Sequence, residues 1–223
     1  MKKDAAGKGG VLVSDFDGTM TRHDFYRLAI ASLLPPDTPD YWAEYRTGVI
    51  THFEALRSYF AAIRASEDEV LAVVKQMDLD VNLPTAVESL RGAGWSVVIT
   101  SAGCDWYIRR LLATAGVDVE IHANPGRFEA GKGLVMEMPT GSAYWSPTLG
   151  VDKARVVSRC VSEGKTVAFA GDGYPDAEAA RLVPAGLRFA RGDLAAVFRS
   201  ESSPFNAFET WSDIADTLLQ RGA

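Results

Sequence analysis

The chain has 223 residues, of which 47% are hydrophobic and 23% are charged, so its composition is that of a globular protein and excludes a disordered or fibrous one. Its net charge of 23 − 29 = −6 argues against sequence-independent nucleic-acid binding, because neutralising phosphates needs clustered lysine and arginine. We expect a cytoplasmic protein, because no apolar run approaches the roughly 18 residues of a membrane span, the first residues lack the apolar stretch of a secretory signal, and Cys104 and Cys160 are too few for a disulfide framework.

The first predicted elements are a short arm and one buried strand. Residues 1–10 are small and polar, which predicts a frayed arm. The β-branched apolar run at 11–17 predicts a buried strand whose carboxyl end opens into a loop at Gly18. This strand ends in carboxylates, which are costly in a buried place unless a cation or a proton compensates them.

A nearly all-helical block follows between residues 23 and 93. Thr38 followed by Pro39 predicts the start of one helix, since a hydroxyl cap and a proline at the first helical position both favour it. Thr51 and Ser66 each precede a glutamate by three residues, which is the pattern of a capping box. Because this block interrupts the alternation of strands and helices, we interpret it as a module inserted after the first strand.

Strands and helices alternate from residue 94 onward. The predicted strands are 96–100, 117–122, 166–170 and 187–190, the predicted helices are one through 109–112, 152–163, 175–182 and one from 211, and the predicted hairpin joins 127–129 to 134–138. Such alternation predicts an α/β fold with a Rossmann-like parallel sheet and helices on both faces. We therefore expect a core of residues 11–22 and 94–223, and a helical cap domain of residues 23–93.

Three polar segments follow three predicted strands, at the edge where open α/β sheets bind ligands. Asp15–Thr19 places two carboxylates two residues apart, on the same side of an extended chain. Ser101–Gly103 offers a hydroxyl and backbone amides suited to phosphate oxygens. Gly171–Asp176 adds two more carboxylates, which are the ligands that Mg²⁺ prefers. Lys153 begins a predicted helix and can bring a positive charge to a phosphoryl oxygen.

Each of these segments also has a purely structural interpretation. An isolated Asp-x-Asp pair is commonly a solvated turn, and Gly-Asp-Gly is commonly a tight turn. Ser101 is also suited to be the N-cap of the following helix, and Lys153 to be a surface lysine. The hypothesis of a site therefore depends on the joint occurrence of four elements in order, three of them at strand ends.

Taken together, the four elements resemble the motifs of the haloacid dehalogenase (HAD) superfamily of phosphohydrolases, over about residues 11–220. Asp15–Thr19 resembles the first motif, Ser101 the second, Lys153 the third and Gly171–Asp176 the fourth. The helical block at 23–93 matches the position of the C1 cap in phosphoserine phosphatases.

Finer similarity points to one subgroup of these enzymes. Asp24, Asn124 and the segment Phe189–Gly192 resemble the subgroup around 2-hydroxy-3-keto-5-methylthiopentenyl-1-phosphate phosphatase. One segment departs from that pattern, because Ser142–Pro147 contains none of the cysteines that precede the third motif in close members. This departure puts the methylthiopentenyl substrate in question.

The resemblance implies a Mg²⁺-dependent phosphatase that hydrolyses a small-molecule phosphomonoester through an aspartyl-phosphate intermediate. It implies Asp15 as the nucleophile and Asp17 as the acid and base, two roles that carboxylates are able to fill. It further implies phosphate binding by Thr19, Ser101, Ala102, Gly103 and Lys153, and metal binding by Asp15, the carbonyl of Asp17, Asp172 and, directly or through water, Asp176. The alternative is a phosphotransferase that passes the phosphoryl group to an alcohol instead of water.

The implied partner is a small phosphorylated metabolite, and the sequence does not define an oligomeric state. The cap is expected to decide the substrate, and it is rich in aromatic residues that we assign mainly to its core. We assign His52 and His122 to structural roles. Arg57 is a candidate to meet a substrate carboxylate or phosphate, but we favour a surface ion pair for it.

Overall fold

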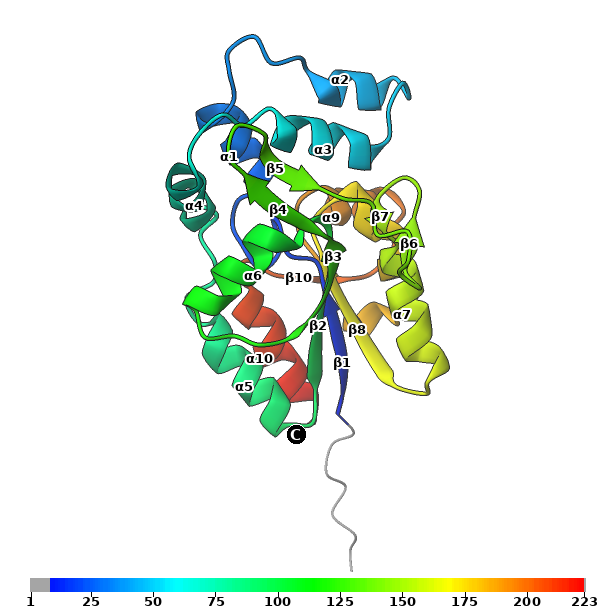
Figure 1. Ribbon diagram of the computed structural model, residues 1–223. Helices are drawn as coiled ribbons and strands as arrows, with labels where there is room; N and C mark the ends of the chain where they lie inside the picture. Colours follow the sequence, from blue (N-terminus) through cyan, green and yellow to red (C-terminus); the bar gives the residue numbers. More distant parts are fainter. Residues whose placement is uncertain (1–8, 223) are drawn as a thin grey trace, which may run out of the picture.

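A six-stranded sheet runs through the centre of the computed structural model, which describes residues 9–222 (Figure 1). Its strand order is β10-β9-β8-β1-β2-β3, and every neighbouring pair is parallel. The strands are β1 (Gly10–Ser14), β2 (Ser96–Cys104), β3 (Glu120–Asn124), β8 (Thr166–Gly171), β9 (Arg188–Ala190) and β10 (Asn206–Ala207). The apolar, β-branched sequence of β1 suits a strand covered on both faces, and β1 lies between β8 and β2.

Helices cover both faces of this sheet, which confirms the predicted fold class. Leu12 points to the face covered by α5 (Leu83–Gly92), α6 (Asp105–Thr114) and α10 (Trp211–Gly222). Val11 and Val13 point to the opposite face, covered by α7 (Lys153–Ser162), α8 (Ala177–Arg181) and α9 (Gly192–Ser200). This alternation follows from the two-residue period of a strand. No helix within residues 9–222 has the length and apolar character to cross a membrane.

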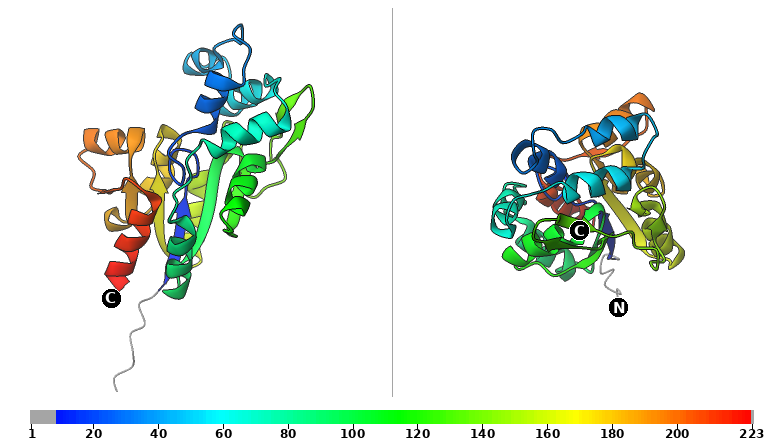
Figure 2. Two further views of the ribbon diagram at one scale, coloured as in Figure 1. Left: turned by 90° about the vertical axis from the view of Figure 1, so that its left-hand side faces the viewer. Right: turned by 45° about the horizontal axis from the view of Figure 1, so that its top comes forward.

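Four further helices lie beyond the carboxyl ends of the central strands (Figures 1 and 2). They are α1 (Phe25–Ser32), α2 (Tyr41–Arg46), α3 (His52–Ala61) and α4 (Glu67–Lys75). Two chain segments run side by side from the sheet to these helices, because Thr21 pairs with Leu79 and the Asp80 amide donates to the Met20 carbonyl at 3.1 Å. Helix α5 packs instead against α10 and β2. The division at residues 23–93 stays a prediction.

Two short antiparallel pairs of strands lie near the carboxyl end of the sheet, as α1–α4 do (Figure 1). The hairpin of β4 (Gly126–Glu129) and β5 (Gly133–Met136) was predicted at nearly these positions, and β5 packs against α3. The pair β6 (Trp145–Ser146) and β7 (Gly150–Val151) precedes α7 and was not predicted. Both pairs therefore stand beside the end of the sheet where a ligand is expected.

Hydrogen bonds at the helix N-termini explain why two predicted helix starts are correct and one is wrong. Both predicted capping boxes are present, at the starts of α3 and α4. The predicted helix start at Thr38 is wrong, because Asp40 caps α2 by accepting from the Ala43 amide, while the Thr38 hydroxyl donates to the Pro35 carbonyl at 2.7 Å. Strand β3 begins at Glu120, three residues later than predicted.

Two further differences lie near the ends of the chain. Helix α9 and strand β10 were not predicted at all. The predicted arm at 1–10 lies outside the described residues except for Gly9 and Gly10, and Gly10 already belongs to β1.

Arg191, at the start of α9, ties the loop after β1 to the rest of the core. Its guanidinium donates to the Gly18 carbonyl at 2.6 Å, to the Thr21 carbonyl at 2.6 Å and to the Glu209 carbonyl at 2.7 Å. It also lies over the Phe208 ring, 5.2 Å from the ring centre. These contacts fix the backbone that carries the first polar segment.

We predict that Arg191→Met lowers the free energy of unfolding by about 2–3 kcal/mol, because three carbonyls lose a charged donor while the apolar stem is kept. Urea unfolding followed by circular dichroism measures this change. The control is Arg109→Met, which removes only an exposed pair with Asp105 and should cost less than about 0.5 kcal/mol. Equal losses in the two variants would contradict the role assigned to Arg191.

Candidate active site

The carboxyl ends of β1, β2 and β8 bring the three polar segments together. Asp15 follows β1, Ser101 lies near the end of β2 and Asp172 follows β8, and these strands are neighbours in the sheet. The loop after β1 turns at Gly18, which has a φ of +69°. A Cβ atom there would lie 2.3 Å from a carboxylate oxygen of Asp172, so only glycine lets the two segments approach this closely.

Lys153 joins two of the carboxylates in the centre of the site. Its Nζ lies 2.8 Å from Asp15 Oδ1 and 2.6 Å from Asp176 Oδ1, and the residue is only 4% exposed. The alternative of a surface lysine is therefore wrong. Burial by itself lowers the pKa of Lys153, but the charges of Asp15 and Asp176 outweigh it and hold this pKa above its ordinary value. Lys153 is thus a buried ammonium group.

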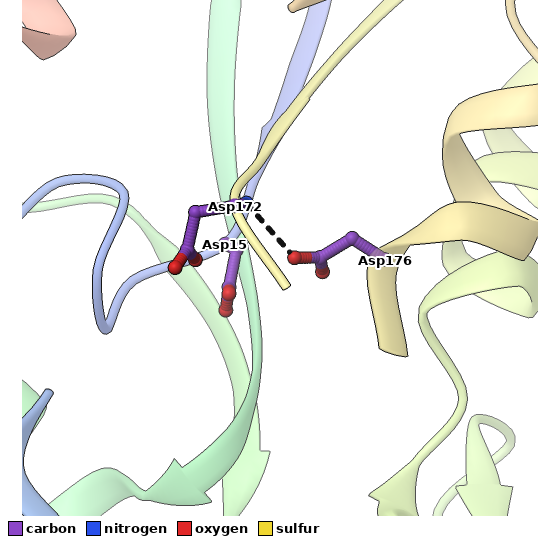
Figure 3. A group of neighbouring side chains, drawn as sticks. All are labelled: Asp15, Asp172 and Asp176. Carbon is purple, nitrogen blue, oxygen red and sulfur yellow. Dashed lines mark hydrogen bonds between the residues drawn. The ribbon is translucent and has the colours of Figure 1, made fainter. Parts of the chain in front are cut away.

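Carboxylate oxygens of Asp15, Asp172 and Asp176 all lie within 4.8 Å of one another (Figure 3). Burial and the negative charge of Asp176 raise the pKa of Asp15 well above its usual range, and the same two causes raise that of Asp172 to about 7. Asp176 is held by its neighbours, because its Oδ2 accepts from the amides of Asp172 at 3.1 Å and Gly173 at 2.9 Å. Three crowded carboxylates therefore face one ammonium group.

This donor set fits a divalent cation that prefers oxygen ligands. Within residues 9–222, Asp15 Oδ2 and Asp172 Oδ2 accept no hydrogen bond, whereas both oxygens of Asp176 are already used. Asp15 and Asp172 therefore each offer one free carboxylate oxygen, the kind of ligand that Mg²⁺ prefers. A divalent ion would also offset the negative charge that Lys153 leaves uncompensated.

Asp17 occupies a separate position, between the sheet and α1. Its Oδ1 accepts from the Phe25 amide at 3.0 Å, and its Oδ2 accepts from the Tyr107 hydroxyl at 2.7 Å. Burial, followed by the charge of Asp24, raises the pKa of Asp17 to about 6. Asp17 therefore changes protonation near neutral pH, which is the property required of a group that both gives and takes a proton.

Tyr107 is a site residue that the sequence did not single out. It lies in α6, its side chain is buried, and its ring packs 4.7 Å from the ring of Phe25. A Cβ atom on Gly103 would lie 1.9 Å from the Tyr107 hydroxyl, so glycine at this position lets the hydroxyl reach Asp17. The sequence offers only a weak signal for this contact, namely a glycine before α6 and a tyrosine four residues later within the helix.

The residues predicted to hold phosphate lie around these carboxylates. Ser101 Oγ lies 3.5 Å from Asp17 Oδ2 and accepts from the Gly103 amide at 2.9 Å. The alternative of Ser101 as an N-cap is wrong, because β2 continues to Cys104 and α6 begins at Asp105. Buried Thr19 donates to Asp172 Oδ1 at 3.1 Å. Ala102 belongs to the same strand end.

Comparison with known proteins identifies the family. A family model described as haloacid dehalogenase-like hydrolase matches residues 12–181, which include all four polar elements. The chain belongs to this family. The predicted membership of the HAD family and the predicted enzyme class are thus confirmed.

Relatives with phosphatase names match nearly the whole chain. A 2-hydroxy-3-keto-5-methylthiopentenyl-1-phosphate phosphatase of Exiguobacterium sibiricum is 23% identical over 214 residues, which cover 93% of this chain and 95% of that protein. The phosphatase of the same name from Brevibacillus brevis is 24% identical over 214 residues, covering 94% and 95% of the two chains. The similarity of this HAD-family chain to these relatives therefore extends over both the core and the helices above it.

Solved structures share the fold. A substrate-bound phosphoserine phosphatase complex has a TM-score of 0.64 at 17% identity, covering 94% of this chain and 98% of that one. An unliganded structure of a probable phosphoserine phosphatase from Vibrio cholerae has a TM-score of 0.67 at 19% identity, covering 98% of this chain and 68% of that one. At these identities the likeness concerns the fold alone.

The crowded carboxylates predict how stability depends on pH when divalent ions are removed. Because the pKa of folded Asp172 is raised to about 7, the ionised carboxylate destabilises the fold as pH rises from its ordinary pKa of about 4 through 7. In EDTA, Asp172→Asn should therefore melt above wild type at pH 8, and this gap should narrow as the pH falls and close near pH 4. Asparagine keeps an acceptor for the Thr19 hydroxyl.

Adding Mg²⁺ at pH 8 should raise the melting temperature of wild type more than that of Asp172→Asn, since an ion at about 100 times its Kd adds about 2.7 kcal/mol. Differential scanning fluorimetry measures both effects. The control is Asp216→Asn, which removes one exposed carboxylate on α10. A gap that does not change with pH, or an equal Mg²⁺ response in both proteins, would contradict the assignment of Asp172.

Proposed function

We propose that this HAD-family enzyme is a cytoplasmic, Mg²⁺-dependent phosphatase that hydrolyses a small phosphomonoester through a phosphorylated Asp15. The observation that carries this proposal is the placement of Asp15, whose Oδ1 is fixed by Lys153 and the Phe16 amide while its Oδ2 has no protein donor within residues 9–222. A carboxylate held in this way has one oxygen oriented for attack. The phosphatase names of the relatives support the same reaction.

In the first step, Asp15 Oδ2 attacks phosphorus and the bond between phosphorus and the ester oxygen breaks. The leaving alcohol takes the proton of Asp17, whose pKa of about 6 leaves a usable fraction protonated near neutral pH. Lys153, Ser101 and the backbone at the end of β2 are positioned to stabilise the phosphoryl oxygens as negative charge moves across them.

In the second step, water attacks the phosphorylated Asp15 and gives one proton to Asp17. The bond between Asp15 and phosphorus breaks, inorganic phosphate leaves, and both carboxylates return to their starting states. When bound, Mg²⁺ lowers the repulsion between a carboxylate nucleophile and a phosphate dianion. Asp15 and Asp172 are the side chains that would hold it, while Asp176 orients Lys153.

We propose that helices α1–α4, within the predicted block 23–93, act as a cap over this site, whereas α5 covers the sheet of the core. The cap would admit the phosphomonoester and exclude bulk water during the reaction. Cytoplasmic location is supported by the two cysteines, because both are free and buried, as is usual in a reducing compartment. The contact between the Phe25 amide and Asp17 links α1 of this cap directly to the proposed acid.

We predict that Asp15→Asn abolishes phosphate release from every phosphomonoester while the protein stays folded, because an amide is a poor nucleophile. The assay measures inorganic phosphate from a panel of small phosphomonoesters with Mg²⁺ or EDTA. Circular dichroism verifies the fold. Activity in the variant above roughly one percent of wild type would overturn Asp15 as the nucleophile.

We predict that Tyr107→Phe lowers kcat/KM for alkyl phosphates about tenfold, because Asp17 loses the hydroxyl that orients its carboxyl group through Oδ2. The kcat/KM for p-nitrophenyl phosphate should change little, since p-nitrophenolate leaves without a proton and kcat/KM does not include the later hydrolysis of phosphorylated Asp15, in which Asp17 acts for both esters. Steady-state kinetics with both kinds of ester measure this difference, and the aryl ester is the internal control. An equal loss on both esters would indicate that Tyr107 has only a structural role.

A further inference from the structure

His52 is the first residue of α3, and it lies close enough to Lys153 and Asp176 for their charges to act on its ring. The Phe53 amide donates to the Thr148 carbonyl at 2.9 Å, which docks the start of α3 on the segment that leads to Lys153. The next carbonyl of that segment, of Leu149, accepts from Asn124 Nδ2, which also donates to the Ala102 carbonyl. This chain of contacts connects the start of α3 to both the end of β2 and the start of α7.

Aromatic neighbours fix the orientation of the His52 ring. The ring of Trp42 lies 5.1 Å away between centres, and the ring of Tyr45 lies 5.5 Å away in an edge-to-face arrangement. Thr51, immediately before His52, is locked by the capping box that starts α3. The orientation of His52 is therefore fixed by ring packing against α2 and by the hydrogen bonds at the start of α3.

The two ring nitrogens of His52 have different surroundings. Nδ1 is buried and has no hydrogen-bond partner within residues 9–222, whereas Nε2 is not enclosed. A buried N–H without an acceptor is less tolerable than a buried lone pair, so the ring carries its proton on Nε2. Burial and, second, the charge of Lys153 lower the pKa of His52 to about 4, so the ring is uncharged at neutral pH. His52 is thus a neutral donor beside the site.

We propose that His52 Nε2–H is a recognition group for the leaving alcohol of the substrate, and that it selects an uncharged oxygen acceptor, a hydroxyl or a carbonyl. This inference rests on the proposed phosphatase function. An ammonium group has no lone pair to accept from Nε2–H. A substrate carboxylate would add negative charge beside Asp15, Asp172 and Asp176 without gaining a cation from His52.

Arg57, the cap cation considered from the sequence, lies elsewhere on α3. It lines a groove of about 450 Å³ between α3 and the β4–β5 hairpin, together with Arg64 and Lys132. Its guanidinium lies over the Phe53 ring at 5.7 Å. Arg57 therefore faces the hairpin, and it provides a matched control for a substitution on the same helix.

The experiment compares glycerol 1-phosphate with propyl phosphate, which has the same carbon chain without the two hydroxyls, and adds phosphoserine as a charged third ester. In wild type, kcat/KM should be roughly 3- to 10-fold higher for glycerol 1-phosphate than for propyl phosphate, the effect of one neutral hydrogen bond, and phosphoserine should be the poorest. His52→Phe keeps the ring and its packing but loses both nitrogens, so this ratio should fall to about one. His52→Gln, which restores an N–H donor, should recover part of it.

Arg57→Leu should leave the ratio at its wild-type value, and melting temperatures of all variants verify folding. An unchanged ratio in His52→Phe, or a wild-type preference for phosphoserine, would overturn the role of His52. If wild type releases phosphate from none of the esters, the proposed phosphatase function itself fails. The two failures are therefore distinguishable.

Discussion

The site depends on one buried ion-pair arrangement, in which the Lys153 ammonium bridges Asp15 and Asp176. Removing one partner of such a buried arrangement costs about 3–5 kcal/mol, because the remaining charge is left uncompensated. Lys153 fixes one oxygen of Asp15 and leaves the other without a protein donor. Three carboxylates around one ammonium group leave negative charge that a divalent cation would offset. The sheet order β8-β1-β2 brings these groups together.

The second constraint is that two different helices bind the carboxylate of Asp17. The amide of Phe25, in α1, and the hydroxyl of Tyr107, in α6, each bind one oxygen of this carboxylate. A displacement of α1 relative to the sheet would break the first of these bonds and change the environment that sets the pKa of Asp17. The position of the helices above the sheet and the pKa of Asp17 are thus coupled through the contact with the Phe25 amide.

Much of the fold and the site follows from local sequence. Buried strands ending in aspartates, glycine beside them and capping boxes at Thr51 and Ser66 are signals carried by a few consecutive residues. Features that depend on residues far apart were missed. Tyr107 reaches Asp17 only because Gly103 lacks a side chain. Helix α9 was missed as well, although Arg191 at its start holds the loop after β1.

The most direct test of the central claim is to trap the phosphorylated enzyme. The wild-type enzyme is mixed with Mg²⁺ and a substrate from the panel, quenched in acid within milliseconds, digested and mapped by mass spectrometry. The account predicts one added phosphoryl group, on Asp15, in the peptide that contains Asp15–Thr19. Phosphorylation at any other residue, or complete turnover with no phosphorylated peptide at any quench time, would contradict it.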